Sequence, residues 1–116
     1  MSIEDLVTGW LSLREVADRL GVSPNKVRQM VREHQLAALR HADAREPEIP
    51  AELLPGDAVV KGLAGTLTLL ADAGYDEEES VRWLFTGDDS LPGRPIDALR
   101  ENRGTEVRRR AQALAF

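Results

Sequence analysis

The stretch "EVADRLGVSPNKVRQMVRE", residues 15–33, decides the fold of this chain. It holds two short helical patterns that meet at the tetrapeptide "GVSP", residues 21–24. A glycine commonly ends a helix in the left-handed conformation, a serine caps the next helix, and a proline suits its first position. The pattern therefore predicts two helices, over residues 13–20 and about 24–33, joined by a tight corner.

The apolar positions of the two helices are spaced so that they face one another. Helices joined by a short glycine-containing turn cross at a steep angle, as in a helix-turn-helix. We expect the apolar side chains to fix this angle by packing between the helices. They are Val16, Ala17, Leu20, Val22, Val27, Met30 and Val31.

The other face of the second helix is polar throughout and is predicted to contact DNA. A helix in this position can enter the major groove, which is roughly 12 Å wide. Amide side chains suit adenine, cationic side chains suit guanine or phosphate, and the free N–H groups behind the capping serine suit a phosphate. The predicted contact residues are Ser23, Asn25, Lys26, Arg28, Gln29 and Arg32.

A β-hairpin is predicted directly after the second helix. Residues 36–40, "LAALR", have the pattern of a short strand, and a second brief strand is expected around Ile49 after a tight turn. A basic wing at this place commonly lies along the minor groove or the phosphate backbone. Arg40, His41 and Arg45 are the predicted wing contacts.

The motif "LSLREVADRLGVSPNKVRQMVREHQLAALR…EIPAELL", over about residues 11–54, resembles a known DNA-binding family. It is similar to the small winged helix-turn-helix of MerR-like and excisionase-like proteins. The shared features are the helix pair, a strand that ends in arginine, and an "IP" second strand. This resemblance implies a protein that reads duplex DNA with its second helix and wing.

The rest of the chain is predicted to be helical. Helices are expected over residues 58–73, from the capping Asp76 through Phe85, from Pro95, and after Gly104, with a loop over residues 86–94. The predicted fold class is mainly α, with a small β-hairpin wing. The predicted domains are a winged helix-turn-helix over residues 1–54 and a C-terminal helical module over residues 55–116, which completes the core.

The segment "VRWLFTGDDSLPGRPIDALRENRGTEVRRRAQALAF", residues 81–116, carries a second resemblance. It resembles the C-terminal module of small actinobacterial winged-helix regulators of the mycobacterial type. Its "WL…L.G.PID.L…G..V" pattern is also similar to the C-terminal module of Xre/ParS-type antitoxins. That second likeness implies a partner toxin or another copy of the chain as the ligand of the module.

Composition limits the partners of the chain. The net charge of −5 over 116 residues argues against non-specific binding of polyanions, although residues 26–45 carry five cations against two acids. We therefore expect DNA binding that is specific and strongly dependent on salt. The chain has no cysteine, no run of apolar residues long enough to span a membrane and no visible secretory signal, which predicts a cytoplasmic protein.

The sequence does not favour catalysis, a cofactor or a metal. Two isolated histidines without cysteines make a poor metal site, and residues 76–79, "DEEE", fit a helix start better than a cation loop. No phosphate-binding glycine loop or nucleophile–base pair is recognisable. Trp83 is expected in the core, whereas residues 108–110, "RRR", suit either a solvated surface or an auxiliary phosphate contact.

Two functions remain open on the sequence. The main prediction is a sequence-specific DNA-binding protein that regulates transcription, with double-stranded DNA as its partner and self-association through the C-terminal module. The alternative is an antitoxin-like or adaptor protein, in which the C-terminal helices grip another protein and DNA binding is secondary or lost. Salt-dependent binding to duplex DNA favours the first, and specific capture of a protein without DNA binding favours the second.

Overall fold

The computed structural model describes residues 2–42, 44–87 and 93–114, and these residues are mainly helical. Part of the loop predicted over residues 86–94 therefore lies outside the described residues. In chain order the elements are α1 (Ile3–Leu6), β1 (Trp10–Leu11), α2 (Leu13–Leu20), α3 (Pro24–Arg32), β2 (Ile49–Pro50), the 3-10 turn η1 (Ala51–Leu53), α4 (Leu63–Asp72), α5 (Glu77–Phe85), α6 (Pro95–Arg100) and α7 (Gly104–Ala113).

The helix pair α2–α3 forms as its local signals predict. Ser12 caps α2 and exchanges hydrogen bonds with Glu15, which lowers the pKa of the Glu15 carboxyl. Gly21 ends α2 with φ +70° and ψ +34°, a left-handed conformation that other residues adopt only at a cost. The Ser23 hydroxyl then accepts the N–H of Lys26 at 3.1 Å and starts α3. The corner is therefore fixed by the left-handed Gly21 and by the Ser23 cap, while Ser12 stabilises the far end of α2.

The contact between α2 and α3 is made by most of the predicted apolar residues. Val16, Ala17 and Val27 are buried. Leu20, Met30 and Val31 are partly buried and pack on the same core. The prediction for Val22 is wrong, because its side chain is 37% exposed. Since Val22 follows the left-handed glycine, the chain has already turned away from the core at this position.

The β-structure differs from the predicted hairpin in its pairing. β2 is antiparallel to β1, the segment before the helix pair, with Trp10 opposite Pro50 and Leu11 opposite Ile49. The predicted strand over residues 36–40 is wrong, since only Leu39 bridges to Glu48 there. The wing is thus a loop closed by one bridge and supported by a two-stranded sheet.

Burial explains why residues 36–40 do not form a strand of the predicted kind. Leu36, Ala37 and Ala38 are all buried, whereas the strand of an open hairpin exposes every second residue. The N–H of Ala38 donates to the Glu77 carboxylate at 2.7 Å and not to a neighbouring strand. The segment therefore passes between the helix pair and the C-terminal helices.

The C-terminal helices follow the predicted order, with one boundary moved. α4 begins at Leu63 and not near residue 58, because Gly62 at φ +88° turns the chain immediately before it. A Cβ on Gly62 would lie 3.2 Å from Leu99 Cδ2, so this glycine also permits close approach to α6. Asp76 and Glu79 form the capping box of α5, as the "DEEE" segment predicts.

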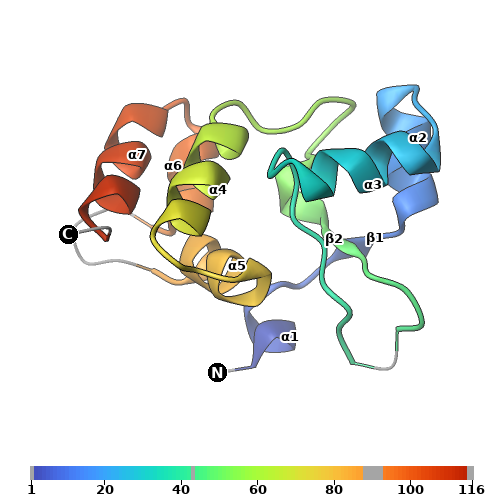
Figure 1. Ribbon diagram of the computed structural model, residues 1–116, viewed down its shortest axis with the longest axis horizontal. Coiled ribbons are helices and arrows are strands. Elements are labelled where there is room, and N and C mark those ends of the chain that lie inside the picture. Colours follow the sequence, from blue (N-terminus) through green and yellow to red (C-terminus); the bar gives the residue numbers. More distant parts are fainter. Residues whose placement is uncertain (1, 43, 88–92, 115–116) are drawn as a thin grey trace.

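One hydrophobic core runs through both ends of the molecule. Figure 1 shows α4, α5, α6 and α7 gathered at one end and α2 and α3 at the other. Leu53 and Leu54 connect the two groups and are completely buried. Trp83, predicted in the core, is partly buried against it. No helix among the described residues has the length and hydropathy needed to cross a membrane.

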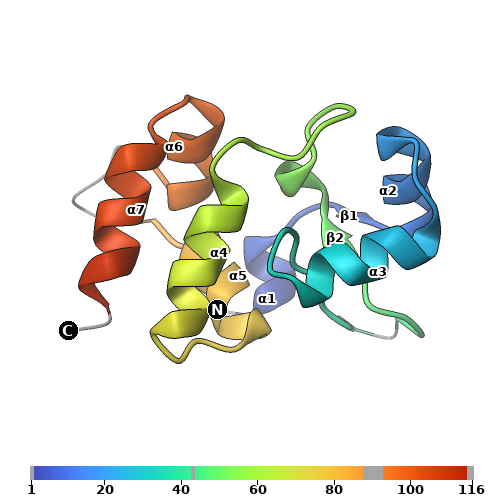
Figure 2. The ribbon, with the colours of Figure 1, turned by 45° about the horizontal axis from the view of Figure 1, so that its top comes forward.

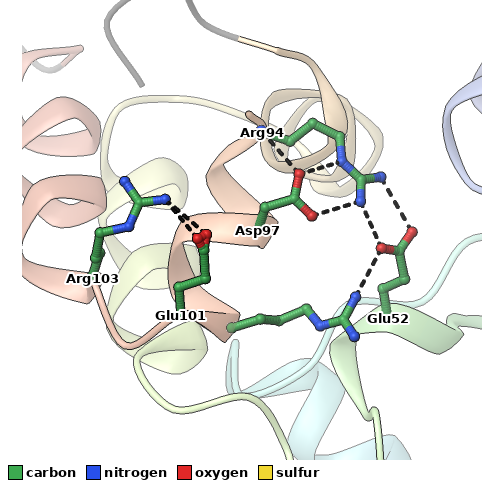
Figure 3. Close-up of polar contacts among 6 residues, drawn as sticks. Glu52, Arg94, Asp97, Glu101 and Arg103 are labelled. Atoms are coloured by element: carbon green, nitrogen blue, oxygen red, sulfur yellow. Dashed lines mark hydrogen bonds and ion pairs between the residues drawn. The ribbon is translucent and has the colours of Figure 1, made fainter. Parts of the chain in front are cut away.

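A cluster of charged side chains joins η1 to α6 (Figure 3). Arg94 donates to Glu52 at 2.7 and 3.2 Å and to Asp97 at 2.7 and 2.9 Å. Arg100 reaches the same Glu52 carboxylate at 3.2 Å. The Arg94 bonds hold the pKa of Asp97 below its usual range, and the two carboxylates raise the pKa of Arg94. The cluster therefore clamps the winged-helix end to the C-terminal helices.

Candidate nucleic-acid interface

The polar face of α3 is exposed along its whole length. All six predicted contact residues on and before this helix are exposed, and the C-terminal helices do not cover them. They are Ser23, Asn25, Lys26, Arg28, Gln29 and Arg32. The structure thus brings these residues together on one accessible surface, which we call the α3 face.

The cations of the α3 face lack acidic partners. Among the described residues, no carboxylate lies within 4.0 Å of Lys26, Arg28 or Arg32. Arg28 donates instead to the neutral amide oxygen of Asn25 at 3.0 Å. By contrast, Arg94, Arg100 and Arg103, which lie in or beside α6, all pair with carboxylates. Despite the net charge of −5, the chain therefore leaves the three cations of α3 available to an anion.

The amide side chains of the α3 face make contacts that water or a ligand can replace. Gln29 Nε2 donates to Glu33 at 3.1 Å, in an exposed pair one turn apart. Asn25 keeps its amide nitrogen available, because only its oxygen accepts from Arg28. Exposed hydrogen bonds of this kind exchange with solvent at little net cost. These amides can therefore turn toward a base edge.

The three predicted wing residues lie in the same loop but have different surroundings. The Arg40 guanidinium donates to the backbone oxygen of Arg45, which draws the loop together. Both arginine residues are exposed. The His41 ring stacks on Trp10 at 3.8 Å with an interplanar angle of 11°, and its Nε2 lies 2.5 Å from Glu48. With 14% of its side chain exposed, His41 has little surface left for a ligand.

A hollow lies between α3 and the base of the wing, and no sequence pattern predicts it. A cleft of about 220 Å³ lies there, lined by Arg28 and Arg32 from α3 and by Ala38 and Pro47 from the wing segment. Its two arginines come from successive turns of one helix, so their side chains are neighbours. The cleft depends on the path of residues 36–48, which local sequence patterns do not determine.

The other charged features have local structural roles. His34 lies just after the C-terminal end of α3 and has φ +61°. A cation is favourable at this end of a helix. Asp76 is used in the capping box of α5. Among the described residues, no group of three or more histidine or acidic side chains is placed to hold a metal ion.

The family models, the relative and the solved structure that match this chain all carry the description Rv2175c. The family model described as "DNA-binding protein Rv2175c, wHTH domain" matches residues 4–54, and that described as "Rv2175c C-terminal domain of unknown function" matches residues 60–115. The DNA-binding protein Rv2175c of Mycobacterium tuberculosis is 43% identical over 117 residues, covering 90% of this chain and 79% of that protein. The NMR structure of Rv2175c matches with a TM-score of 0.83 at 41% identity, over 93% of this chain and 82% of that one.

Proposed function

The chain belongs to the Rv2175c family of winged helix-turn-helix DNA-binding proteins, and on that premise we propose that it binds duplex DNA sequence-specifically through α3. The observation that carries the proposal is the α3 face, where exposed amides lie on one short helix with cations that have no acidic partner in the part of the chain that the structure describes. A helix of this size fits the major groove, whose base edges differ for every base pair.

The residues of α3 divide into two roles in this proposal. Asn25 and Gln29 contact base edges, for which their paired donor and acceptor atoms suit adenine. Lys26, Arg28 and Arg32 contact guanine or the phosphates on either side of the groove. Ser23 and the first N–H groups of α3 hold one phosphate, because a helix start favours a negative charge.

The wing adds contacts through Arg40 and Arg45. Both are exposed and lie in a loop that projects beyond the sheet (Figure 1). His41 is the third predicted contact, but its stack on Trp10 suits it better to hold the loop in place. We therefore assign His41 a positioning role that keeps the two arginines directed at the DNA backbone.

Beyond DNA binding itself, we propose that the protein regulates transcription and associates with a second copy. A protein that recognises a DNA site is suited to regulate transcription, and self-association through the C-terminal module would double the site it reads. Three further points stay predictions from the sequence. They are the resemblance to MerR-like, excisionase-like and Xre/ParS-type proteins, the cytoplasmic location and the absence of catalysis. The family description, which names DNA binding, supports a binding function over an enzymatic one.

The experiment begins by selecting binding sites from a random duplex library with the full chain. Lys26→Ala and Arg28→Ala are then compared on the selected site, with Lys61→Ala as the matched control because Lys61 is also exposed and lies outside α3. Each α3 variant should lower affinity roughly tenfold, and one that removes a phosphate contact should lower the salt slope by about 1. All variants should keep the thermal midpoint of the wild type, since these side chains are exposed.

The outcome also decides between the two functions. Equal affinity of Lys26→Ala, Arg28→Ala and wild type for the selected site would contradict the role of α3. Failure to select any DNA site at low salt, together with specific capture of another protein by the C-terminal helices, would favour the antitoxin-like or adaptor function.

A further inference from the structure

A cavity of about 310 Å³ lies between the winged-helix end and the C-terminal helices. Figures 1 and 2 both show the C-terminal end of α3 pointing toward α4 and α5, and the cavity is bounded by these elements. Its apolar wall includes Leu36, Leu67 and Ala71, with Tyr75 beside them. The volume is at the lower end of the range for small-molecule sites, so it suits a small ligand.

The charged residues of the cavity have opposite signs at its two ends. The cation Arg32 lines it from the end of α3, with the imidazole of His34 after it, whereas the acids Asp76 and Glu77 line it from the start of α5. Within the described residues, Arg32 has no carboxylate within 4.0 Å, so the charges on the two sides do not neutralise one another directly. A molecule with both charges could bridge them.

Glu77 is held in place before any ligand arrives. One oxygen of its carboxylate accepts the Ala38 N–H at 2.7 Å, which directs the group along the cavity wall. Glu77 is exposed as a residue, but desolvation on the side of the Ala38 bond raises the pKa of its carboxyl, and the Ala38 N–H and nearby His34 offset the rise only in part. A carboxylate that has lost part of its hydration gains when an ammonium group binds it.

We propose that this cavity binds a small zwitterion with an apolar body, in the chemical class of a free hydrophobic α-amino acid. The ammonium group pairs with Glu77, the carboxylate pairs with Arg32, and the apolar side chain lies against Leu67 and Ala71 beside the Tyr75 ring. Both charges of the ligand then meet an opposite charge of the protein, and the apolar wall supplies the remaining affinity.

Ligand binding in this cavity would oppose DNA binding, a consequence that rests on the proposed function. Arg32 belongs to the α3 face and also lines the cavity, so a ligand carboxylate and a DNA phosphate compete for the same guanidinium. Coupling between two sites is reciprocal, so DNA should weaken ligand binding by the same factor as the ligand weakens DNA binding.

The first test measures ligand binding by calorimetry on the full chain without DNA. The probes are the apolar L-amino acids, with phenethylamine, which lacks the carboxylate, and 3-phenylpropionate, which lacks the ammonium. At least one amino acid should bind, and each single-charge analogue should bind roughly tenfold more weakly or worse. No binding of any amino acid at about 10 mM, or equal binding of an analogue, would overturn the proposal.

A pair of variants tests the assigned contact. Glu77→Gln keeps an oxygen that can accept the Ala38 N–H but loses the charge, so amino-acid affinity should fall roughly tenfold. Glu78→Gln is the matched control, because its side chain pairs with Arg82 and does not line the cavity. Equal losses in the two variants, or no loss in Glu77→Gln, would overturn the role of Glu77.

The second test adds the selected DNA site. Glu77→Gln should match the DNA affinity of the wild type when no amino acid is present, and roughly tenfold more amino acid should be needed to weaken its DNA binding to the same extent. Amino-acid binding with unchanged DNA affinity would overturn the competition at Arg32. Because the calorimetry contains no DNA, a chain that fails to bind DNA still leaves the ligand site tested by itself.

Discussion

Replacing Glu52 by Gln tests the clamp between the two ends of the molecule. Glu52 accepts two hydrogen bonds from Arg94 and one from Arg100, which join η1 to α6 and the residue before it. The substitution keeps the shape of the side chain but removes its negative charge and leaves an amide nitrogen facing two guanidinium groups. We expect the folded state to lose most of this interaction.

The burial of the partners sets the size of the effect. Glu52 is 22% exposed and Arg94 is 29% exposed, so the pair lies between an exposed ion pair, worth about 1 kcal/mol or less, and a buried pair, whose disruption costs about 3–5 kcal/mol. Arg94 keeps its bonds to Asp97, which limits the loss. We therefore expect a loss of about 2 kcal/mol in the free energy of unfolding, or about 8 °C in the thermal midpoint.

The assay is urea and thermal unfolding of the wild type, Glu52→Gln and a matched control. Glu78→Gln removes the same charge from an exposed pair with Arg82 on one turn of α5, where the side chains are 57% and 38% exposed. This control should lose at most about 0.5 kcal/mol. If the two variants lose the same stability, the clamp does not hold the two ends together and the reasoning is refuted.

Four further predictions concern local conformation and acid stability. Gly21→Ala should cost about 1 kcal/mol from backbone strain alone, because no atom lies within 4 Å of the added Cβ at φ +70°; urea unfolding that matches the wild type would contradict this. Ser23→Ala should cost about 1 kcal/mol of the same quantity by removing the cap of α3, and it should also weaken binding to the selected DNA. Arg94 lowers the pKa of Asp97 in the folded state. The stability that the Asp97 carboxylate contributes is therefore complete above its ordinary pKa of about 3.9, and it is lost as pH falls through the lower folded value. Asp97→Asn should flatten this acid loss when the free energy of unfolding is measured against pH. Desolvation raises the pKa of Glu77 in the folded state, so the effect of this carboxyl on stability has the opposite sign. Its stabilising effect is complete below the ordinary pKa of about 4.3 and is lost as pH rises through the higher folded value. Over that rise in pH, Glu77→Gln should gain stability relative to the wild type.

Local signals in the sequence were sufficient for the helix pair. The left-handed Gly21, the Ser23 cap and the spacing of Val16 and Val27 act over a few residues, and the structure has the predicted helices with nearly the predicted ends. The α3 face follows from the same helix geometry, because an exposed polar stripe is fixed once the buried stripe is known. The most local part of the candidate site was thus the most predictable part.

Local sequence patterns do not predict the pairings between distant segments. β2 pairs with β1 although about forty residues separate them, and two-residue strands have no periodicity to detect. The stack of His41 on Trp10 and the Ala38–Glu77 hydrogen bond likewise join residues whose sequence neighbourhoods predict nothing about each other. These contacts decide where the wing projects and where the cavity lies, so both had to come from the structure.

The bond from the Ala38 amide to the Glu77 carboxylate has a consequence for anyone who excises the DNA-reading end as a fragment. A piece ending near residue 54 would strip this amide of its acceptor, uncover Leu53 and Leu54 and remove the partners of Glu52. Water would then replace the lost acceptor of the amide, but the two newly exposed leucines alone cost several kcal/mol, comparable to the whole stability of a small domain. Residue 54, the predicted end of the first domain, is therefore not a suitable truncation point, and shortened chains should retain α4 and α5.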